Sequence, residues 1–389
     1  MTTPDTLLQQ ISVPFEYPVA FTRGVCRPDN RLLVDTVRRR GEKRRHRMLV
    51  LIDSGVAKAR PGLAAEIQAY AAAYADHLEL VQPPRVVPGG EGIKNDLMGL
   101  AGFINTMVER RLCRHSYVVV VGGGAVLDAI GFAAALVHRG LRLVRVPTTV
   151  LAQCDSGVGV KNAINLNGVK NLVGTFAPPF AVLNDFDLLD TLPERSWTDG
   201  IAEAFKVAII KDRMFFDWLI ANAGALRARD RAAMEHLVRR CAELHLEHIR
   251  AHGDPFEFGT ARPLDFGHWS AHRLEAMSNY KVSHGHAVAI GLALDAAYSV
   301  SMGWLGLEEF ELLYKGLAEV GFVLWHDLLG RERNGELDVL RGLHEFREHL
   351  GGELSLTMPK GLGASHEVGE VDPALIARAV ARLKSLAPA

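Results

Sequence analysis

Four histidines crowd one short stretch of the sequence, "FGHWSAHRLEAMSNYKVSHGH" at residues 266–286. His268 and His272 are spaced i, i+4, so on a helix they share one face, and His284 and His286 open the next apolar run. Two histidines with one carboxylate suit a catalytic zinc site, because open positions remain for substrate oxygens. The stretch therefore predicts metal binding, although acid–base catalysis or a chance cluster also fits the histidines alone.

The carboxylate of such a site has to come from another segment. Glu203 in "DGIAEAFK" is an attractive choice, since the same predicted helix carries Lys206. A competing histidine cluster lies in "HLEHIRAH", where His245, His248 and His252 could also share a helix face. Long surface helices can carry such histidines without any function, so we favour the cluster described first.

A glycine-rich turn in "VVVVGGGAVLDAIGF" joins a predicted strand to a predicted helix. The three glycines at 122–124 would let the backbone approach a pyrophosphate, whose charge a helix N-terminus favours. Asp53 ends an earlier strand, where it could bind a ribose hydroxyl, and "PGGEGIK" adds Glu91 and Lys94 beside another glycine turn. The spacing is not GxGxxG, so nucleotide binding and a plain tight turn are about equally supported.

The densest polar stretch is "PTTVLAQCDSGVGVKNAINLNGVKN" at residues 147–171. Lysines and asparagines on a glycine-rich backbone suit a phosphorylated, polyhydroxylated ligand, and the alternative is a solvated loop. Together with a metal and a nucleotide, the stretch points to redox chemistry on a phosphorylated sugar. Its candidate binding residues are Asp155, Lys161, Asn162, Lys170 and Asn171.

Two kinds of pattern divide the chain near residue 185. Before it, β-like runs alternate with helical patterns, which predicts a parallel sheet covered by helices. After it, apolar residues recur at helical spacing. We therefore expect a Rossmann-like α/β domain at 1–185, an all-helical domain at 186–389 and a ligand cleft between them. The β-like runs are 48–53, 78–87, 117–124, 142–149 and 180–185, and the later helical runs are 199–212, 232–252, 286–304 and 372–386.

Composition excludes several classes of protein. The 389 residues carry 44 basic and 45 acidic side chains, so the net charge favours neither nucleic acid nor an anionic membrane as a partner. The basic run at 37–47 is interpreted as a solvated helix end. Four separated cysteines without a CxxC pair argue against disulfides or a thiolate zinc site. Without a signal-peptide pattern or a long apolar run, the sequence predicts a cytoplasmic protein.

Several motifs resemble those of one family. "GGGAVLDAIGF", "RGLRLVRVPTTVLAQCDSGVGVKNAINLNGVKNLVGTF", "TLPER", "AEAFK", "FGHWSAHRLE" and "HGHAVAIG" together look like the 3-dehydroquinate synthase family, the sugar phosphate cyclases. The matches keep the family's order from about residue 50 to residue 300. The resemblance implies an NAD-binding Rossmann-like domain, a helical metal-binding domain and a homodimer.

The resemblance also assigns roles to individual positions. His286 replaces the glutamate of the usual "HGE", so it is the surplus histidine, and Arg139 matches an arginine that reaches the phosphate from the neighbouring subunit. The implied metal ligands, for Zn or Co, are Glu203, His268 and His284. The implied catalytic and substrate-holding residues are His272, Lys206, Lys161, Asp155, Lys170 and Asn171. The implied NAD contacts are Asp53, Glu91, Lys94, Gly123, Gly124, Asp128, Thr148 and Thr149.

The implied reaction uses NAD without consuming it. A ring carbinol is oxidised, phosphate is eliminated, the hydride returns, the ring opens, and an intramolecular aldol closes a carbocycle. A metal-dependent polyol dehydrogenase shares the general fold but would not need the phosphate-binding residues. A catalytically silent binding protein is the third possibility, yet every position needed for catalysis carries a suitable residue.

The substrate expectation rests on departures from the family pattern. A 3-dehydroquinate synthase holds a substrate carboxylate with three cations, and the matching positions here are His245, Ala261 and Glu353, with Arg262 beside the second. The usual asparagine before "GH" has become Asp265. Losing cations opposite a carboxylate costs several kcal/mol, whereas a polyol would accept these side chains as hydrogen-bond partners. We therefore expect sedoheptulose 7-phosphate as substrate and a valiolone-type cyclitol as product. The retained histidine at 272 favours 2-epi-valiolone, but the stereochemistry stays open, as does 3-dehydroquinate synthase activity.

Overall fold

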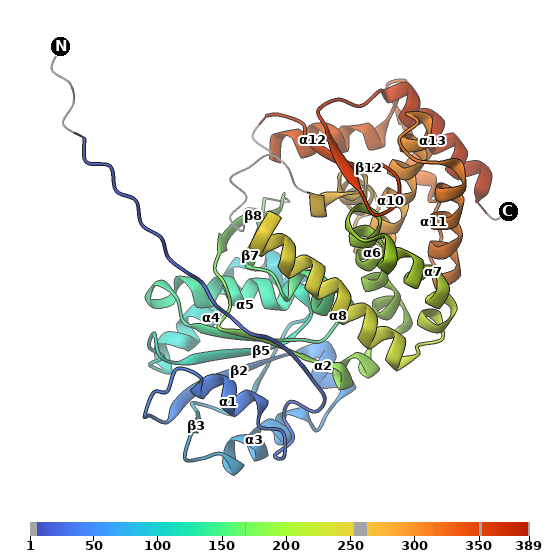
Figure 1. Ribbon diagram of the computed structural model, residues 1–389. Helices are drawn as coiled ribbons and strands as arrows, with labels where there is room; N and C mark the ends of the chain where they lie inside the picture. The colour runs from blue at the N-terminus through green and yellow to red at the C-terminus, as the bar shows by residue number, and fades with distance from the viewer. Residues whose placement is uncertain (1–5, 168, 253–262, 350–351, 388–389) are drawn as a thin grey trace.

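The computed structural model describes residues 6–167, 169–252, 263–349 and 352–387 (Figure 1). Its N-terminal half contains one parallel sheet in the order β1-β9-β6-β5-β2-β3, with β4 also paired to β2. All six residues of β5 are buried, as expected for a strand covered on both faces. The strands are β1 (Val19–Thr22), β2 (His46–Asp53), β3 (Leu78–Leu80), β4 (Arg85–Val87), β5 (Tyr117–Gly122), β6 (Arg142–Pro147) and β9 (Ala181–Asp185).

Helices cover both faces of this sheet. Apolar residues of α1 and α3 pack on one face, and those of α4 and α5 pack on the other. Along the sheet the chain order reverses between β2 and β5, and a ligand crevice is expected at the carboxyl ends of the strands on either side of such a reversal. The helices are α1 (Leu32–Arg38), α2 (Ser54–Ala59), α3 (Leu63–Ala73), α4 (Leu97–Glu109) and α5 (Gly124–Leu136).

The C-terminal half is mostly helical and packs around α10, which is buried along nearly its whole length. No helix within the described residues is long and apolar enough to cross a membrane. The helices are α6 (Glu194–Lys211), α7 (Arg213–Arg227), α8 (Arg231–Glu247), α9 (His268–Met277), α10 (His284–Ser301), α11 (Leu307–Val320), α12 (Arg341–His349) and α13 (Pro373–Leu386).

The predicted fold class, a parallel α/β domain followed by a helical domain, is confirmed with one addition. The helical half also holds two short antiparallel hairpins, which the helical periodicity of the flanking segments did not reveal. One of them packs a fully buried strand against α10, so it closes part of the core. The hairpin strands are β10 (Glu332–Arg333), β11 (Glu336–Leu337), β12 (Leu356–Pro359) and β13 (Ser365–Val368).

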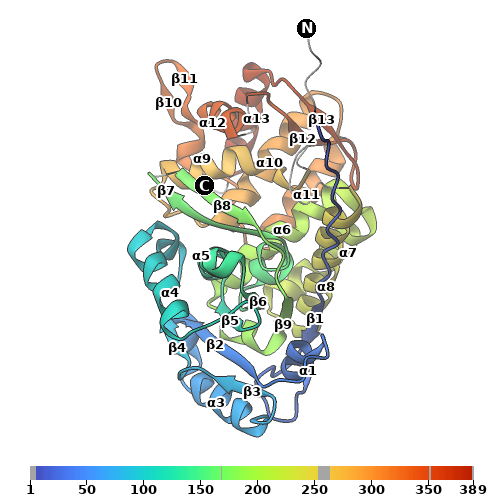
Figure 2. The same cartoon turned by 90° about the vertical axis from the view of Figure 1, so that its left-hand side faces the viewer.

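A third hairpin begins within the polar stretch at 147–171, for which the sequence left a solvated loop as the alternative. It consists of β7 (Lys161–Leu166) and β8 (Val169–Phe176), and lies between α5 and the helical half (Figure 2). Its pairing shifts from Ile164↔Val173 to Leu166↔Val169, so residues 170–172 bulge opposite a single residue of β7. The Asn-Gly pair at 167 and 168 was the missed signal, because it favours a two-residue hairpin turn.

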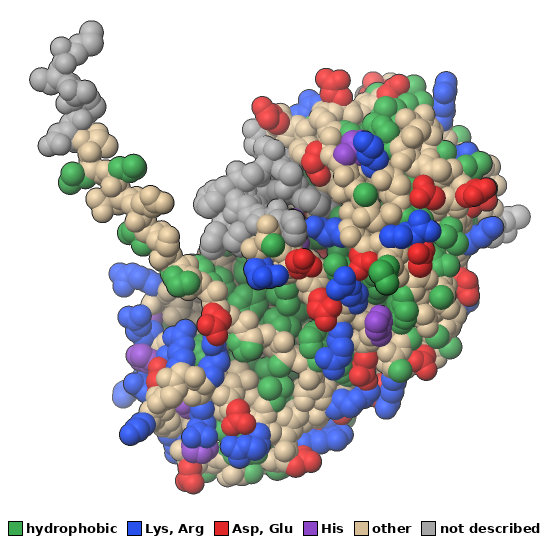
Figure 3. Space-filling view, viewed as in Figure 1, with side chains coloured by type: hydrophobic (Ala, Val, Ile, Leu, Met, Phe, Trp, Pro, Cys, Tyr) green, Lys and Arg blue, Asp and Glu red, His purple; other side chains and the backbone are tan. Residues whose placement is uncertain are grey.

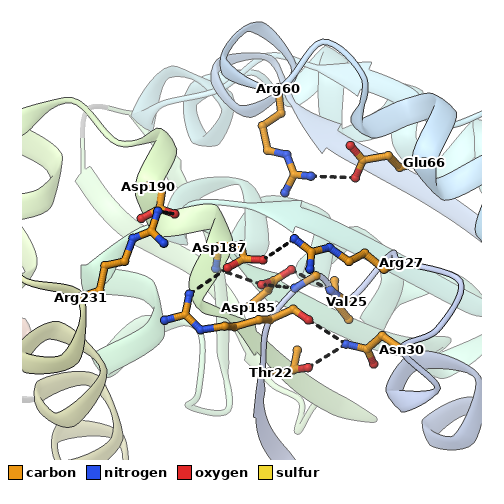
Figure 4. A network of polar contacts seen from close by, with 12 residues as sticks. Thr22, Val25, Arg27, Asn30, Arg60, Glu66, Asp185, Asp187, Asp190 and Arg231 are labelled. Carbon is orange, nitrogen blue, oxygen red and sulfur yellow. Dashed lines mark hydrogen bonds and ion pairs between the residues drawn. The ribbon is translucent and has the colours of Figure 1, made fainter.

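Polar contacts fix the point where the sheet gives way to the helices (Figure 4). The carboxylate of Asp185, the last residue of β9, accepts hydrogen bonds from the backbone N–H groups of Gly24 (2.9 Å) and Val25 (2.8 Å). A few residues later, Asp190 pairs with Arg231 at the start of α8 at 2.6 Å. The end of β1 and the start of the helical half are thereby tied to the same corner of the sheet.

An N-terminal arm extends away from the body before β1 (Figures 1 and 3). Where the arm joins the body, the hydroxyl of Tyr17 donates to the carbonyl of Val158 at 2.9 Å, and Arg39 donates to the carbonyl of Glu16 at 3.1 Å. Before it, large apolar side chains are exposed, and Figure 3 shows hydrophobic atoms of this arm standing clear of the body. These side chains are Leu7, Leu8, Ile11, Val13 and Phe15, which are 58–90% exposed.

Candidate active site

Three helices bring one carboxylate and two imidazoles together. Glu203 lies in the middle of α6, while His268 and His284 are the first residues of α9 and α10. The Oε1 atom of Glu203 is 3.4 Å from Nε2 of His284 and 3.7 Å from Nε2 of His268. All three donor atoms lie within 4.8 Å of one another, and Glu203 is only 1% exposed. This spacing suits a single metal ion with open coordination positions.

Hydrogen bonds orient both imidazoles for metal binding. Nδ1 of His268 donates to the carbonyl of Phe266 at 3.0 Å, and Nδ1 of His284 lies 3.1 Å from Oε2 of Glu275. Each Nε2 therefore faces Glu203. Burial would lower the pKa of His284, but the carboxylates of Glu203 and Glu275 outweigh it and raise this pKa to about 9. A bound metal ion would take the place of the proton that His284 carries on Nε2 in its charged form.

A second group of possible ligands, His272, Glu275 and His284, shares one histidine with the first. The remaining oxygen of Glu275 accepts a hydrogen bond from Nζ of Lys170 at 3.2 Å, and this neighbouring cation disfavours a dication at the same carboxylate. The ring of His272 is exposed, and its centroid lies 5.3 Å from that of His268. His272 is therefore better suited to proton transfer beside the first group than to metal binding.

A chain of alternating charges leads away from the metal group. Nζ of Lys206 pairs with Glu203 and lies 3.1 Å from Oδ2 of Asp155, whose Oδ1 is 3.0 Å from Nδ1 of His245 on α8. Burial would raise the pKa of Asp155, but Lys206 and His245 hold it well below its usual range. Burial likewise opposes the charge of Lys206, yet Asp155 and Glu203 raise its pKa. The first three groups of this chain are consequently ionised at neutral pH.

The bulge in β8 directs two neighbouring side chains to different partners. Lys170 reaches Glu275 on α9, whereas Oδ1 of Asn171 accepts a hydrogen bond from Lys94 on the opposite side. Asn171 adopts a left-handed backbone with φ of 56°, which asparagine tolerates better than most residues. Lys94 also pairs with Asp128 of α5 at 2.8 Å. The hairpin thus lies between the metal group and the predicted NAD contacts.

The glycine turn leaves the start of α5 open. Gly123 and Gly124 begin this helix, and neither a side-chain cap nor an acidic residue occupies its first turn. A Cβ atom on Gly124 would lie 2.6 Å from Oγ of Ser156, and one on Gly123 would lie 3.2 Å from Cγ2 of Thr149. Neighbouring Thr148 is held by its backbone N–H, which donates to Gly122 at 3.0 Å. The free amide groups can therefore receive a pyrophosphate.

The other predicted NAD contacts include residues at the carboxyl end of β2 and on a short helix beside the hairpin. Asp53 ends β2, and its Oδ1 accepts the N–H of Gly55 at 2.7 Å. Glu91 and Lys94 lie on the short helix η1 (Glu91–Asn95), where Glu91 accepts a hydrogen bond from Asn165 of β7 at 3.1 Å. Because β2 and β5 flank the reversal of strand order, these residues lie where a dinucleotide is expected.

Arg139 is not brought into the site of its own chain. It is exposed in the turn between the end of α5 and the start of β6, at the opposite edge of the sheet from the glycine turn. The 13 residues of α5 separate these two edges by about 20 Å. Three consecutive positive φ angles, of 51° at His138, 61° at Arg139 and 119° at Gly140, shape this turn.

The residues expected to face a substrate carboxylate are placed unevenly. His245 lies inside the charge chain. Burial and the charge of Lys206 lower the pKa of His268, and the carboxylate of Asp265 opposes this shift. Glu353 is exposed in the segment before β12, and the contacts of the described residues do not join it to the site. Ala261 and Arg262 lie outside the described residues. Lys161, at the start of β7, carries an exposed side chain.

The remaining histidines have partners outside the metal group. Nδ1 of His286 lies 3.0 Å from Oδ1 of Asp199, which also accepts a hydrogen bond from Ser283 at 2.7 Å. Asp199 is one turn before Glu203 on α6, so His286 helps to fasten α10 to α6. His248 meets Lys211 at 3.2 Å, and among the described residues neither it nor His245 belongs to a metal-like group.

Sequence reasoning missed two acidic residues that support this site. Glu275 follows His268 and His272 at i+7 and i+3, so its helical spacing was an available signal. Asp295 in the interior of α10 accepts hydrogen bonds from Nε1 of Trp269 at 2.9 Å and from the N–H of Gly267 at 3.2 Å. Burial raises the pKa of Asp295 to about 7. Asp295 thus holds the two residues next to His268, which are Gly267 and Trp269. In the sequence it is a single acid within an apolar helix, and this pattern does not predict such a role.

Comparison with known proteins identifies the family. The family model described as 3-dehydroquinate synthase N-terminal matches residues 85–199, and the one described as 3-dehydroquinate synthase C-terminal matches residues 200–339. A 3-dehydroquinate synthase of Alkaliphilus metalliredigens is 34% identical over 280 residues, covering 72% of this chain and 76% of that protein. The chain belongs to the 3-dehydroquinate synthase family, as its motifs predicted. It is an enzyme of phosphate elimination and cyclisation.

Solved structures agree with this assignment. ValA, a 2-epi-5-epi-valiolone synthase from Streptomyces hygroscopicus subsp. jinggangensis 5008 with NAD+ and Zn2+ bound, superposes with a TM-score of 0.84. It is 26% identical, and the match covers 98% of this chain and 99% of that one. A 2-deoxy-scyllo-inosose synthase complexed with carbaglucose-6-phosphate, NAD+ and Co2+ has a TM-score of 0.74 at 21% identity, over 93% and 95% of the two chains. This second likeness concerns the fold.

Proposed function

We propose that the enzyme converts a C7 ketose phosphate that lacks a carboxylate, sedoheptulose 7-phosphate, into 2-epi-valiolone or a stereoisomer of it, using NAD and Zn²⁺ or Co²⁺. The observation that carries this proposal is the pairing of His245 with Asp155 at 3.0 Å. The family places a substrate-binding lysine at this position. Here the side chain already serves a carboxylate of the protein, and Asp265 adds a further acid near the metal group.

The residues present fit both cofactors. Two oriented imidazoles and one buried carboxylate form a donor set for zinc or cobalt, and the uncapped glycine turn of α5 fits a pyrophosphate. The 26% identical ValA structure, with NAD+ and Zn2+ bound, supports the same pair. When bound, NAD would supply a reversible hydride acceptor and the metal a Lewis acid at the substrate oxygens.

The protein's own residues would then bind and orient the sugar phosphate. Lys206 and Asp155, fixed in the charge chain, would hold ring hydroxyls beside the metal group, with Lys161 on the hairpin. Lys170 and Asn171 would hold the phosphate, together with Arg139 of the partner subunit in a homodimer. His272, exposed beside the metal histidines, would move a proton at the carbon next to the oxidised one as the phosphate leaves.

A second candidate is 3-dehydroquinate synthase activity itself. The relative of that name at 34% identity favours it. The two candidates share the metal group, the phosphate residues and the redox cycle, and differ only in the end of the substrate that carries a carboxylate.

Steady-state kinetics separate the two candidates. Purified enzyme with NAD⁺ and Zn²⁺ or Co²⁺ is offered sedoheptulose 7-phosphate and, separately, the carboxylated substrate of 3-dehydroquinate synthase. We expect a higher kcat/KM for sedoheptulose 7-phosphate, release of inorganic phosphate and no net NADH. NMR of the product would then define its stereochemistry. A higher kcat/KM for the carboxylated substrate would overturn the proposal, and net NADH would indicate a dehydrogenase.

A further inference from the structure

Among the described residues, Glu275 is the one buried acid that touches both the metal group and the β7–β8 hairpin. Its Oε2 lies 3.1 Å from Nδ1 of His284, and its Oε1 accepts a hydrogen bond from Nζ of Lys170 at 3.2 Å. The side chain is about 6% exposed, so water does not compete strongly for either oxygen. We propose that Glu275 is a positioning residue that fixes the metal-binding tautomer of His284 and holds Lys170 at the phosphate position.

The first part of this role follows from the chemistry of imidazole. A histidine that binds a metal through Nε2 must keep its proton on Nδ1, and a carboxylate acceptor at Nδ1 fixes that tautomer and makes Nε2 a better ligand. His268 has a backbone carbonyl, that of Phe266, as its acceptor. His284 has the negative charge of Glu275 instead, so Glu275 is the stronger of the two supports.

The second part follows from the bulge in β8. Lys170 leaves the hairpin at this bulge and crosses to α9 in the helical half, where Glu275 is its partner. Burial would lower the pKa of Lys170, but Glu275 and Glu91 outweigh it and keep the ammonium charged. The same carboxylate competes with a phosphate dianion for this ammonium. Glu275 therefore keeps Lys170 in place without a ligand and weakens its hold on a phosphate, which helps the product to leave.

These two contacts give opposite effects when the charge is removed. In Glu275→Gln the side chain keeps its shape, but His284 loses its anionic acceptor, and metal affinity should fall by about 10–100-fold. Lys170 loses its competing anion, so inorganic phosphate should bind several-fold more tightly. General loosening of the site would weaken both ligands, so a shift in opposite directions distinguishes a positioning role from a structural one.

The experiment uses two variants and two probes that need no turnover. Zn²⁺ affinity is measured by chelator competition, with the visible spectrum of bound Co²⁺ as a second readout, and inorganic phosphate affinity is measured by calorimetry on the Zn²⁺- and NAD⁺-loaded protein. Glu345→Gln is the matched control, because Glu345 lies on α12 with a half-exposed side chain and pairs at 3.0 Å with Arg273, which α9 directs toward α12. It should leave both affinities and the Co²⁺ spectrum unchanged.

The outcome does not depend on which sugar phosphate is the substrate, since the role rests on the proposed metal site and on the proposed phosphate contact of Lys170, but not on the sugar. Weaker metal binding with tighter phosphate binding in Glu275→Gln supports the inference. Unchanged affinities for both probes, or a parallel loss of both, would overturn it. Thermal unfolding of both variants in the metal-free state identifies a parallel loss that comes from misfolding, and Glu275→Asp, with a shorter carboxylate, should restore only part of the metal affinity.

Discussion

The two ends of the candidate substrate site are built very differently. At the metal end, Glu203, His268 and His284 come from three helices, and each has a partner that fixes its orientation. At the far end, the histidine at a position where the family has a cation, His245, is already engaged by Asp155, and the exposed Glu353 is not joined to the site by a contact of the described residues.

This difference suggests that the metal end serves the reaction and that the far end serves recognition of the substrate. Oxidation, elimination and ring closure need the same groups whichever sugar phosphate is bound, so the metal end is densely supported. The far end only has to complement one part of the substrate, and one charge changed there alters selectivity without disturbing the reacting carbons. The following predictions test this separation, beginning with the largest expected effect.

Replacement of a metal ligand should abolish both metal binding and catalysis. In Glu203→Ala, His268→Ala and His284→Ala we expect loss of bound metal, measured by elemental analysis, and loss of turnover. Glu203→Ala should also destabilise the fold by about 3 kcal/mol, because it leaves buried Lys206 with one partner fewer. His245→Ala is the control and should keep its metal. If metal content survived all three changes but not His245→Ala, the second histidine cluster would be the site.

Hybrid dimers should show whether the phosphate is held by two chains. Arg139→Ala and His268→Ala proteins are each expected to be nearly inactive. After subunit exchange, half of the dimers should be mixed and each should contain one intact site, giving about one quarter of wild-type activity. Activity is measured as phosphate release, and exchange is verified with differently tagged chains. Complete exchange without recovery would show that Arg139 acts within its own chain or not at all.

A cation restored at the far end should change selectivity rather than chemistry. His245→Lys would place an ammonium where the family carries one, and we expect the ratio of kcat/KM for the carboxylated substrate to that for sedoheptulose 7-phosphate to rise by about tenfold, or about 1.4 kcal/mol. Bound metal should be unchanged. His236→Lys on the exposed side of the same helix is the control. An equal change of kcat/KM for both substrates would contradict a recognition role for this position.

The smallest predicted effect concerns Asp295, which holds the residues on either side of the metal ligand His268. Burial raises the pKa of Asp295 to about 7, above its value of about 4 in an unfolded chain. Its contribution to stability is therefore present at low pH and is lost as the pH rises through 7. Asp295→Asn should cost about 1–3 kcal/mol at pH 6, because the amide cannot accept both hydrogen bonds.

Between pH 6 and 8.5 this deficit should shrink by about 1.4 kcal/mol, since only the wild-type protein has to ionise a buried acid. Urea unfolding at several pH values measures the difference. Asp217→Asn, an exposed partner of Arg213 on α7, should follow the wild-type pH profile. A deficit for Asp295→Asn that stays constant with pH would show that the buried carboxyl does not titrate in this range.

The predictable part of the fold was the part with strong periodicity. Continuous valine runs and helical spacing in the two halves predicted the sheet, its helical cover and the later helices. The β7–β8 hairpin was missed because neither strand shows the usual alternation: four consecutive residues of β7 are buried, and β8 exposes the apolar side chains of Val169, Leu172 and Phe176. Short hairpins such as β12–β13 depend on packing against α10, and local sequence does not reveal such tertiary contacts.

The site was predictable where residue type alone limits the chemistry. Few side chains other than histidine and an acid form such a metal group, and the family motifs pointed to Glu203 as the acid. Glu275 and Asp295 escaped notice because their roles depend on neighbours that are distant in sequence, Lys170 for the first and the tertiary packing of α9 on α10 for the second. The position of Arg139 at the other edge of the sheet likewise follows from topology and not from its own motif.

The bulge in β8 also limits how this enzyme can change over evolutionary time. Lys170 and Asn171 reach opposite partners only because three residues oppose one at this point of the hairpin. Hairpin register is set by the turn, and a shift of one residue exchanges the faces of a strand. An insertion or deletion beside Asn167 would therefore turn both side chains away from their partners at once. New substrates can be acquired through point substitutions at positions such as 245 and 265, whereas the length of this hairpin has to remain constant.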